Sequence, residues 1–299
     1  MKFWDWLPPA DFLRIITLCS FVWMSISGCA FTLDQDRFVT AGVGEKLTRS
    51  SGNCQESALF EGGQEEVLSP VGLDPARIAL LDWNIYKERR VGWERDFLRF
   101  SSEKDIIVLQ EASLTEDLLQ LFKAKQLYWN FNSAFRYKGV ETGVLTAARL
   151  KPYGSCGMRY NEPVIIFPKT IIVSRFPISG SREQLLVANV HGINITLGIE
   201  AYQKQFDALR AVLQKHKGPL ILVGDFNNWN DKRTGVVDLL AEKLSLRVLA
   251  FGDGGRTRFF DKPVDHVLFR GLEPVAHTVH SVTSSDHNPI SVTFRLGSK

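Results

Sequence analysis

The sequence is poor in cysteine and carries no strong charge of either sign. It has four cysteines among 299 residues, and none of their spacings matches a zinc site, so a structural zinc ion is disfavoured. Its formal net charge is only +3 and no long basic strip is visible, so its charge permits a nucleic-acid partner without requiring one. No internal repeat is visible. With 44% hydrophobic and 23% charged residues, the composition is that of an ordinary globular protein with a substantial core.

The N-terminus also lacks an uncharged run long enough to span a membrane comfortably. Residues 15–28 (IITLCSFVWMSISG) carry no charge, but 14 residues are few for about 30 Å of hydrocarbon. This length is typical of the apolar region of a secretory signal. The run leads into the tetrapeptide ISGC, which ends at Cys29 and resembles a bacterial lipobox, in which the cysteine receives lipid. We therefore predict an export signal over residues 1–28 and a lipid on Cys29; an uncleaved anchor helix starting near Phe12 is the alternative.

Either arrangement places the rest of the chain in the cell envelope, outside the cytoplasm, and fixes it to the membrane. Disulfides form and persist in such compartments. With Cys19 inside the signal and Cys29 lipidated, Cys54 and Cys156 remain as one pair, so we predict a disulfide between them. Two unrelated buried thiols are the alternative. No obligate protein partner is evident.

Residues 29–75 are rich in Gly, Ser, Gln and Glu and show little periodicity, which predicts a partly flexible tether. Over residues 76–299, short apolar runs alternate with amphipathic segments, which predicts one domain. Strands are expected at 78–83, 105–109, 143–147, 164–173, 184–190, 220–223, 266–269 and 290–294. Helices are expected from Ser113, where Ser113 and Glu116 have the spacing of a capping box, and over residues 200–216. This pattern predicts an α/β fold of two packed β-sheets flanked by helices.

Polar side chains that can bind metal or move protons recur at the ends of these apolar runs. Strand ends are where a rigid sheet presents several side chains to one cleft. Each of these residues alone has an ordinary explanation, such as an Asx turn, a helix cap or a hydrogen-bonded core histidine. The joint pattern is hard to explain in that way, so we predict a single site. Its members are Asn84, Glu111, His191, Asp225, Asn227, Asp265, Asp286 and His287.

The ordered motifs WN, LQE, NVH, GDFN, DHVL and SDHNP resemble those of the endonuclease/exonuclease/phosphatase superfamily, which includes deoxyribonuclease I. The resemblance runs from about residue 77 to residue 296 and is most specific in GDFN and SDHNP, which lie about 60 residues apart. It implies a four-layer α/β sandwich of the deoxyribonuclease I type. It also implies hydrolysis of phosphate esters with the help of a divalent metal ion.

The resemblance assigns a metal site to three of the predicted residues. Glu111 corresponds to the principal carboxylate ligand, Asn84 lies beside it, and Asp286 helps to bind metal or to orient His287. Oxygen donors of this kind suit Mg²⁺, which retains several waters and takes one or two carboxylates. The expected ion is therefore Mg²⁺, with Mn²⁺ as the alternative.

The same resemblance assigns catalytic roles to the other five residues. Asp225 orients or deprotonates the attacking water, and Asn227 holds that water or a phosphate oxygen through its amide. His287 donates to the phosphate as negative charge develops, while Asp265 hydrogen-bonds the other ring nitrogen and raises the pKa of the histidine. His191 is similar to a second histidine found in deoxyribonuclease I-like and sphingomyelinase-like branches. Together these groups are expected to position water in line and to neutralise the phosphate.

The sequence specifies the substrate less closely. After Asn84 the chain continues IYKERR, where the family often has an acidic or small residue and then glycine. These basic residues either contact a phosphate backbone or lie in a solvated loop. No aromatic pair of the abasic-site type and no phosphoinositide motif is visible. We expect a phosphodiesterase that acts on DNA; a sphingomyelinase-like phospholipase C is the second hypothesis. A binding lipoprotein of the same fold without activity is disfavoured because Glu111, Asp225 and His287 are all present.

Overall fold

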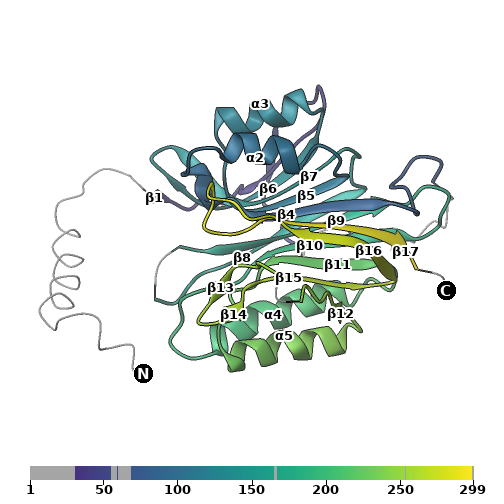
Figure 1. Ribbon diagram of the computed structural model, residues 1–299. Coiled ribbons are helices and arrows are strands. Elements are labelled where there is room, and N and C mark those ends of the chain that lie inside the picture. The colour runs from purple at the N-terminus through teal and green to yellow at the C-terminus, as the bar shows by residue number, and fades with distance from the viewer. Residues whose placement is uncertain (1–30, 55–58, 60–68, 165–166, 253, 298–299) are drawn as a thin grey trace, which may run out of the picture.

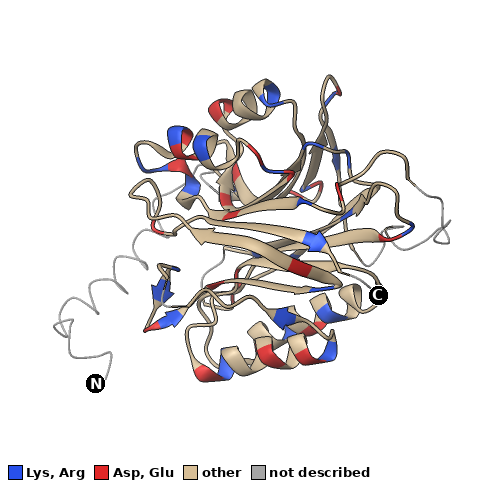
Figure 2. Cartoon of the chain, turned by 45° about the vertical axis from the view of Figure 1, so that its right-hand side comes forward, with Lys and Arg blue, Asp and Glu red and all other residues tan. Residues whose placement is uncertain are grey.

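Two mixed β-sheets pack face to face, with helices on the outer face of each (Figure 1). The computed structural model describes residues 31–54, 59, 69–164, 167–252 and 254–297. Figure 2 shows that Lys, Arg, Asp and Glu gather on the outer helices, whereas the strands between them are largely uncharged. This arrangement of layers confirms the predicted four-layer α/β sandwich.

The first sheet has the strand order β16-β17-β4-β5-β7-β6-β2-β3, with β1 paired to β6. Its one parallel pairing is β4 with β5; β17 runs antiparallel to β4. The strands are β1 (Phe31–Thr32), β2 (Phe38–Ala41), β3 (Thr48–Ser50), β4 (Ile78–Asn84), β5 (Ile106–Ser113), β6 (Tyr128–Tyr137), β7 (Val140–Ala148), β16 (Leu272–Val279) and β17 (Ile290–Leu296).

The second sheet has the order β12-β15-β11-β10-β9-β8 and also contains one parallel pairing, β10 with β11. A separate hairpin, β13 (Arg258–Phe259) and β14 (Lys262–Pro263), precedes β15 in the chain. The strands of the sheet are β8 (Gly154–Tyr160), β9 (Lys169–Pro177), β10 (Gln184–His191), β11 (Leu220–Asp225), β12 (Arg247–Val248) and β15 (Asp265–Arg270).

In the part of the chain that the structure describes, four α-helices cover the outer faces, α2 and α3 on the first sheet and α4 and α5 on the second (Figure 1). The helix expected from Ser113 begins later: Ser113 ends β5, and the side chain of Thr115 caps the helix by accepting from the Leu118 amide at 3.3 Å. The helix expected over 200–216 is present but ends at Leu213. The helices are α2 (Trp93–Phe100), α3 (Glu116–Ala124), α4 (Glu200–Leu213) and α5 (Asp231–Lys243).

Seven of the eight expected strands lie where the apolar runs predicted them, and the eighth is displaced. Instead of 164–173, β9 begins at Lys169, immediately after Pro168, and continues to Pro177. Proline has no backbone N–H to give to a ladder, which is a reason for the strand to start after it. Nine of the described strands were not predicted: the longer β6, β8 and β16, and the short β1, β2, β3, β12, β13 and β14. The sequence of β6, YWNFNSAFRY, interleaves polar residues that the structure buries between neighbouring strands, so its hydropathy pattern is weak.

The prediction of a tether over residues 29–75 is wrong for the part from β1 to β3. Strand β2 pairs with β6 of the first sheet, and β3 pairs with β2, so this segment extends the sheet. The predicted disulfide is confirmed: Cys54 and Cys156 are bonded, with their Cα atoms 4.8 Å apart, and join this segment to β8 of the second sheet. The predicted export signal and Cys29 lie outside the described residues. Among the residues that the structure does describe, no helix is both long and apolar enough to cross a membrane.

Strands β4 and β5 of the first sheet and β10 and β11 of the second turn one face towards the other sheet. On each strand this face is apolar where the strand begins and polar where it ends. Near the polar end, the buried Gln110 amide donates to Asp82 at 2.9 Å and to Asn189 of the second sheet at 2.7 Å. Burial, and then the negative charge of Asp265, raise the pKa of Asp82 well above its usual value. Each strand therefore carries its last inward-facing residues to one polar edge of the sandwich. The apolar residues of the same faces are Ile78, Leu80, Ile106, Val108, Leu185, Val187, Ile221 and Val223.

Candidate active site

The candidate site lies where the carboxyl ends of the two parallel pairs meet. Asn84 ends β4, while His191 and Asp225 are register partners at the ends of β10 and β11. The Asn84 amide donates to Asp225 Oδ2 at 3.1 Å, and both residues are buried. This hydrogen bond joins the two sheets at the polar edge and brings the first and second halves of the predicted site together.

Glu111 occupies a β-bulge in β5. The register with β7 shifts between Leu109 and Ala112, and Glu111 has a φ of 50°, unusual for a residue with a side chain. Lys87 forms an ion pair with Glu111, and Lys169 Nζ lies 3.8 Å from its Oε1. Burial by itself would raise the pKa of this carboxyl, but the charges of Lys169 and Lys87 bring the pKa below its usual value. Glu111 is therefore an ionised carboxylate at the edge of the cleft.

The GDFN segment holds Asp225 in a conformation that requires the preceding glycine. Gly224 has a φ of +135°, and a Cβ there would lie 2.1 Å from the Val190 carbonyl oxygen. The Asn227 backbone amide donates to Asp225 Oδ1 at 3.0 Å, and its side-chain amide donates to Oδ2 at 3.1 Å. Burial raises the pKa of Asp225 to about 6, although the positive charge of His287 opposes the shift. Asp225 can therefore exchange a proton near neutral pH.

Asp265 and His287 form a hydrogen-bonded pair, as predicted. His287 Nδ1 lies 2.9 Å from both carboxylate oxygens of Asp265, and its Nε2 lies 4.0 Å from Asp225 Oδ2. Burial alone would lower the pKa of His287, but the charge and hydrogen bond of Asp265, followed by the charge of Asp225, raise it to about 10. The ring is thus an imidazolium at neutral pH, with Nδ1–H donating to Asp265 and Nε2–H directed to the cleft.

The loop that carries His287 is fixed to the first sheet. Trp83 Nε1 donates to the His287 carbonyl oxygen at 3.0 Å, and Ser285 Oγ donates to the Asn84 carbonyl oxygen at 2.7 Å. The backbone of His287 is therefore held by β4, while its side chain pairs with Asp265 of β15. Asp286, the neighbour in this loop, is exposed, and its role as a metal ligand stays a prediction.

His191 is buried between the two carboxylates. Its Nε2 lies 3.5 Å from Asp225 Oδ2, 3.8 Å from Glu111 Oε1 and 2.8 Å from Lys169 Nζ. Burial, and then the charges of Lys169 and Lys87, lower the pKa of His191 well below its usual value. The ring is therefore neutral, and its Nε2 accepts from the Lys169 ammonium, which leaves the proton on Nδ1.

Two groupings in the site have the chemistry to hold a divalent metal ion. The partly buried Glu111 and the buried Asn84, which pairs in register with Gln110, offer oxygen donors that suit a hard cation. Asp225, Asp265 and His287 offer ligand atoms that all lie within 4.8 Å of one another. In the second grouping Nδ1 of His287 already pairs with Asp265, so only its Nε2 is directed to the cleft.

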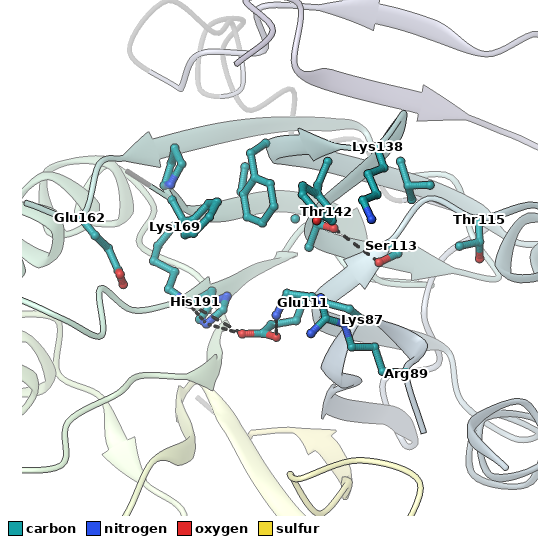
Figure 3. A pocket seen from close by; sticks show the side chains of 17 residues that line it. Lys87, Arg89, Glu111, Ser113, Thr115, Lys138, Thr142, Glu162, Lys169 and His191 are labelled. Carbon is teal, nitrogen blue, oxygen red and sulfur yellow. Dashed lines mark hydrogen bonds and ion pairs between the residues drawn. The ribbon is translucent and has the colours of Figure 1, made fainter. Parts of the chain in front are cut away.

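Sequence reasoning missed Lys169, which contacts both His191 and Glu111. It opens β9, and a cation directly before the apolar run TIIV was the one available signal. Lys87 was predicted only as one of several basic residues that either contact a phosphate backbone or lie in a solvated loop, and the structure pairs it with Glu111. Beside these residues opens a pocket of about 720 Å³ (Figure 3).

The chain is similar to known proteins over most of its length. The model of the Endonuclease/Exonuclease/phosphatase family matches residues 83–287. A UPF0294 protein of Vibrio campbellii is 34% identical over 267 residues, covering 89% of this chain and 91% of that protein.

Solved structures share the fold at low sequence identity. The human Nocturnin catalytic domain, with bound sulfate, matches with a TM-score of 0.57 and 19% identity, over 76% of this chain and 97% of that one. Zebrafish (D. rerio) TDP2, complexed with a single-strand DNA product, matches with a TM-score of 0.56 and 15% identity, over 73% of this chain and 99% of that one. Members of this superfamily are hydrolytic phosphoesterases that generally use a divalent metal ion. The chain belongs to the endonuclease/exonuclease/phosphatase family.

Proposed function

We propose that the protein is a metal-dependent nuclease that hydrolyses phosphodiester bonds in DNA. The observation that carries this proposal is the convergence of an ionised carboxylate, Glu111, with the Asp265–His287 pair and the buried Asp225 in one cleft. The single-strand DNA product bound to the similarly folded TDP2 is consistent with such a substrate. Basic side chains at the same edge, Lys87 and Lys169, supply the positive charge that a phosphate backbone requires.

Asp225 is the residue placed to act on the attacking water. Its pKa of about 6 leaves it mostly deprotonated at neutral pH, yet basic enough to accept a proton. The two amide donors of Asn227 fix the orientation of the carboxylate. A water held by Asp225 would therefore approach the phosphorus from a fixed direction, which favours in-line displacement.

His287 acts at the phosphate as a hydrogen-bond donor. Asp265 holds Nδ1–H, so Nε2–H is the donor that faces the cleft. Because the ring is already protonated, it stabilises negative charge on the phosphate oxygens and can deliver a proton to the leaving oxygen. His191, neutral and bonded to Lys169, holds that ammonium between the two sheets.

Glu111 and Asn84 would hold the metal ion, Mg²⁺ or Mn²⁺, with Asp286 as a further candidate. Such an ion supplies Lewis-acid stabilisation of the phosphate charge. Lys87 pairs with Glu111 in the structure, so metal binding at this carboxylate requires Lys87 to share it or to move.

The proposal also places the protein in the cell envelope, attached to the membrane through residues 1–29. The Cys54–Cys156 disulfide supports an oxidising compartment, because structural disulfides are rare where thiols are kept reduced. Radiolabelled palmitate should enter the wild-type chain and be absent from Cys29→Ala. Equal labelling of both would contradict the lipid anchor.

The test of the function combines a substrate panel with one variant. Plasmid DNA, RNA and sphingomyelin are offered to the full-length chain with Mg²⁺, with Mn²⁺ and with chelator. DNA should be cleaved, and chelator should abolish cleavage. Glu111→Gln should reduce the rate on the order of 100-fold or more, because it removes the charge that holds the ion.

Calorimetry should show weaker Mn²⁺ binding to Glu111→Gln and unchanged binding to Glu103→Gln, whose carboxylate is 83% exposed and outside the site. Cleavage of sphingomyelin but not DNA, or activity that resists chelator, would contradict the proposal.

A further inference from the structure

The pocket beside the candidate site has an aromatic wall. Phe135 and Phe167 both line it, with ring centroids 4.8 Å apart and planes at 44°. Tyr137, two residues further along β6, lines it too. Phe167 and Tyr137 are each 43% exposed, so part of each side chain is accessible to a ligand. An accessible aromatic wall of this kind can stack flat rings.

The floor of the pocket is the catalytic edge itself. Glu111, His191 and Lys169 line it, and Figure 3 shows the Lys169 side chain reaching towards His191 and Glu111. A group attached to a phosphate at Glu111 therefore has direct access to the aromatic wall. The pocket is part of the substrate's path and is not a separate cavity.

The pocket is also surrounded by positive charge. Four cationic side chains line it, against two acidic ones. Lys138 lies across the pocket from Lys169 in Figure 3, with its Nζ 5.3 Å from the centroid of the Tyr137 ring. Cations on both sides suit a ligand that carries negative charge at more than one point. An acyl chain carries no charge and would not be stabilised by these cations. A lipid with a single phosphate could pair with the cations on only one side of the pocket.

A buried acceptor adds a requirement for polarity. Glu162 lines the same pocket and is 3% exposed; its Oε1 accepts from the Asn194 amide at 2.6 Å. The backbone amide of Ile195 also hydrogen-bonds to this carboxylate. A ligand with some polar groups therefore suits this part of the pocket better than a hydrocarbon.

The geometry points to a subsite for a nucleotide base of single-stranded nucleic acid, next to the phosphate that is cleaved. The base stacks on Phe167, whose ring Phe135 supports from the side, while Lys138 and Lys169 contact backbone phosphates on either side. Bases in a duplex are stacked on their neighbours and cannot offer a face to this wall, so the subsite selects single strands. This inference rests on the proposed nuclease function and specifies its substrate.

The test measures binding separately from cleavage. The full-length chain in detergent, with His287→Ala to prevent hydrolysis, is titrated into a fluorescein-labelled eight-nucleotide oligo-dT in Mg²⁺, and anisotropy gives the Kd. Phe135→Ala and Phe167→Ala should each weaken binding at least fivefold, because loss of one base–aromatic stack has an effect of that size or more. Phe167→Leu keeps an apolar side chain without the flat ring and should weaken binding as well, which separates stacking from a folding defect.

Phe259→Ala is the matched control. Phe259 is 49% exposed on the β13–β14 hairpin and does not line the pocket, so its loss should leave the Kd unchanged. A duplex of the same length should bind with a Kd that does not depend on Phe167.

Three results would overturn the subsite. The first is that the pocket variants bind the oligonucleotide as tightly as the parent does. The second is that Phe259→Ala weakens binding as much as they do. The third is that the pocket variants lose binding to dihexanoylphosphatidylcholine and keep binding to the oligonucleotide. Failure of the subsite is distinguishable from failure of the nuclease proposal. If the chain with His287 intact cleaves DNA but the pocket variants bind and cleave normally, only the subsite is wrong; if no DNA is cleaved, the function is wrong.

Discussion

The first sheet is built around the parallel pair β4 and β5, and the second around the parallel pair β10 and β11. In both, inward faces change from apolar to polar along the strand and end at the same edge of the sandwich. The acidic residues that the two sheets present at this edge differ in their pKa values. The first sheet presents Glu111, whose pKa is lowered by two lysines, whereas the second presents Asp225, whose pKa is raised to about 6 by burial.

This difference separates two tasks that phosphoester hydrolysis requires. A carboxylate that stays ionised over a wide pH range is suited to hold a cation, and one that titrates near neutrality is suited to exchange a proton. His287 connects the two sides, because its backbone is held by Trp83 of the first sheet and its ring by Asp265 of the second. The catalytic unit that we propose is therefore shared between the sheets.

The largest expected effect comes from removing this shared unit. His287→Ala should lower kcat about 100- to 10,000-fold, the range usual for loss of a general acid. Asp265→Ala should lower kcat by the same factor or less, because it acts through the ring. The double variant should be little worse than His287→Ala, since residues that act as a unit are not additive. Losses that multiply in the double variant would show that the two act independently.

The pH profile of kcat/KM can show whether Asp225 and His287 titrate as the structure indicates. Activity should rise as Asp225 loses its proton near pH 6 and fall as His287 loses its proton near pH 10. Asp265→Asn removes the negative charge that keeps the ring protonated, so the pKa of His287 falls and the alkaline limb moves to lower pH. The acid limb, which belongs to Asp225, should remain. An alkaline limb that does not move would assign it to another group.

Much of the sandwich and of its site was predictable from sequence for one physical reason. Strands buried on both faces read as continuous Val, Ile and Leu runs, and a polar residue that ends such a run marks the sheet edge. Asn84, His191 and Asp225 were found in this way, and the structure brings them together. The strands that were missed have no such run: β16 is largely exposed, and β6 buries polar residues by pairing them with neighbouring strands.

The remaining features depend on contacts between distant segments. Lys169 matters because β9 places it against His191 and Glu111, and nothing next to it in sequence shows that. The polar composition of residues 29–75 suggested a tether, yet β2 has buried residues and pairs with β6. Local composition cannot show that a partner strand lies within reach.

The smallest effect on catalysis is expected from the link between the sheets at Cys54 and Cys156. Their replacement by alanine should lower the free energy of unfolding by roughly 2–4 kcal/mol, because the bond closes a long loop in the unfolded chain. The activity per folded molecule should stay near that of the wild type, since neither residue lines the cleft. Denaturant unfolding followed by intrinsic tryptophan fluorescence measures the first quantity. A large loss of kcat would show that the disulfide also sets the geometry of the site.

The position of β17 inside the first sheet, between β16 and β4, makes the order of this sheet depend on the last strand of the chain. Ribosomes make the chain from the N-terminus, and Trp83 lies 204 positions before the His287 carbonyl that it binds. A nascent chain that has reached β15 has every strand of the second sheet, but it lacks His287 and the strand that anchors the loop. Such long-range pairings also form late and slowly. The candidate site is therefore complete only when the last strand is in place.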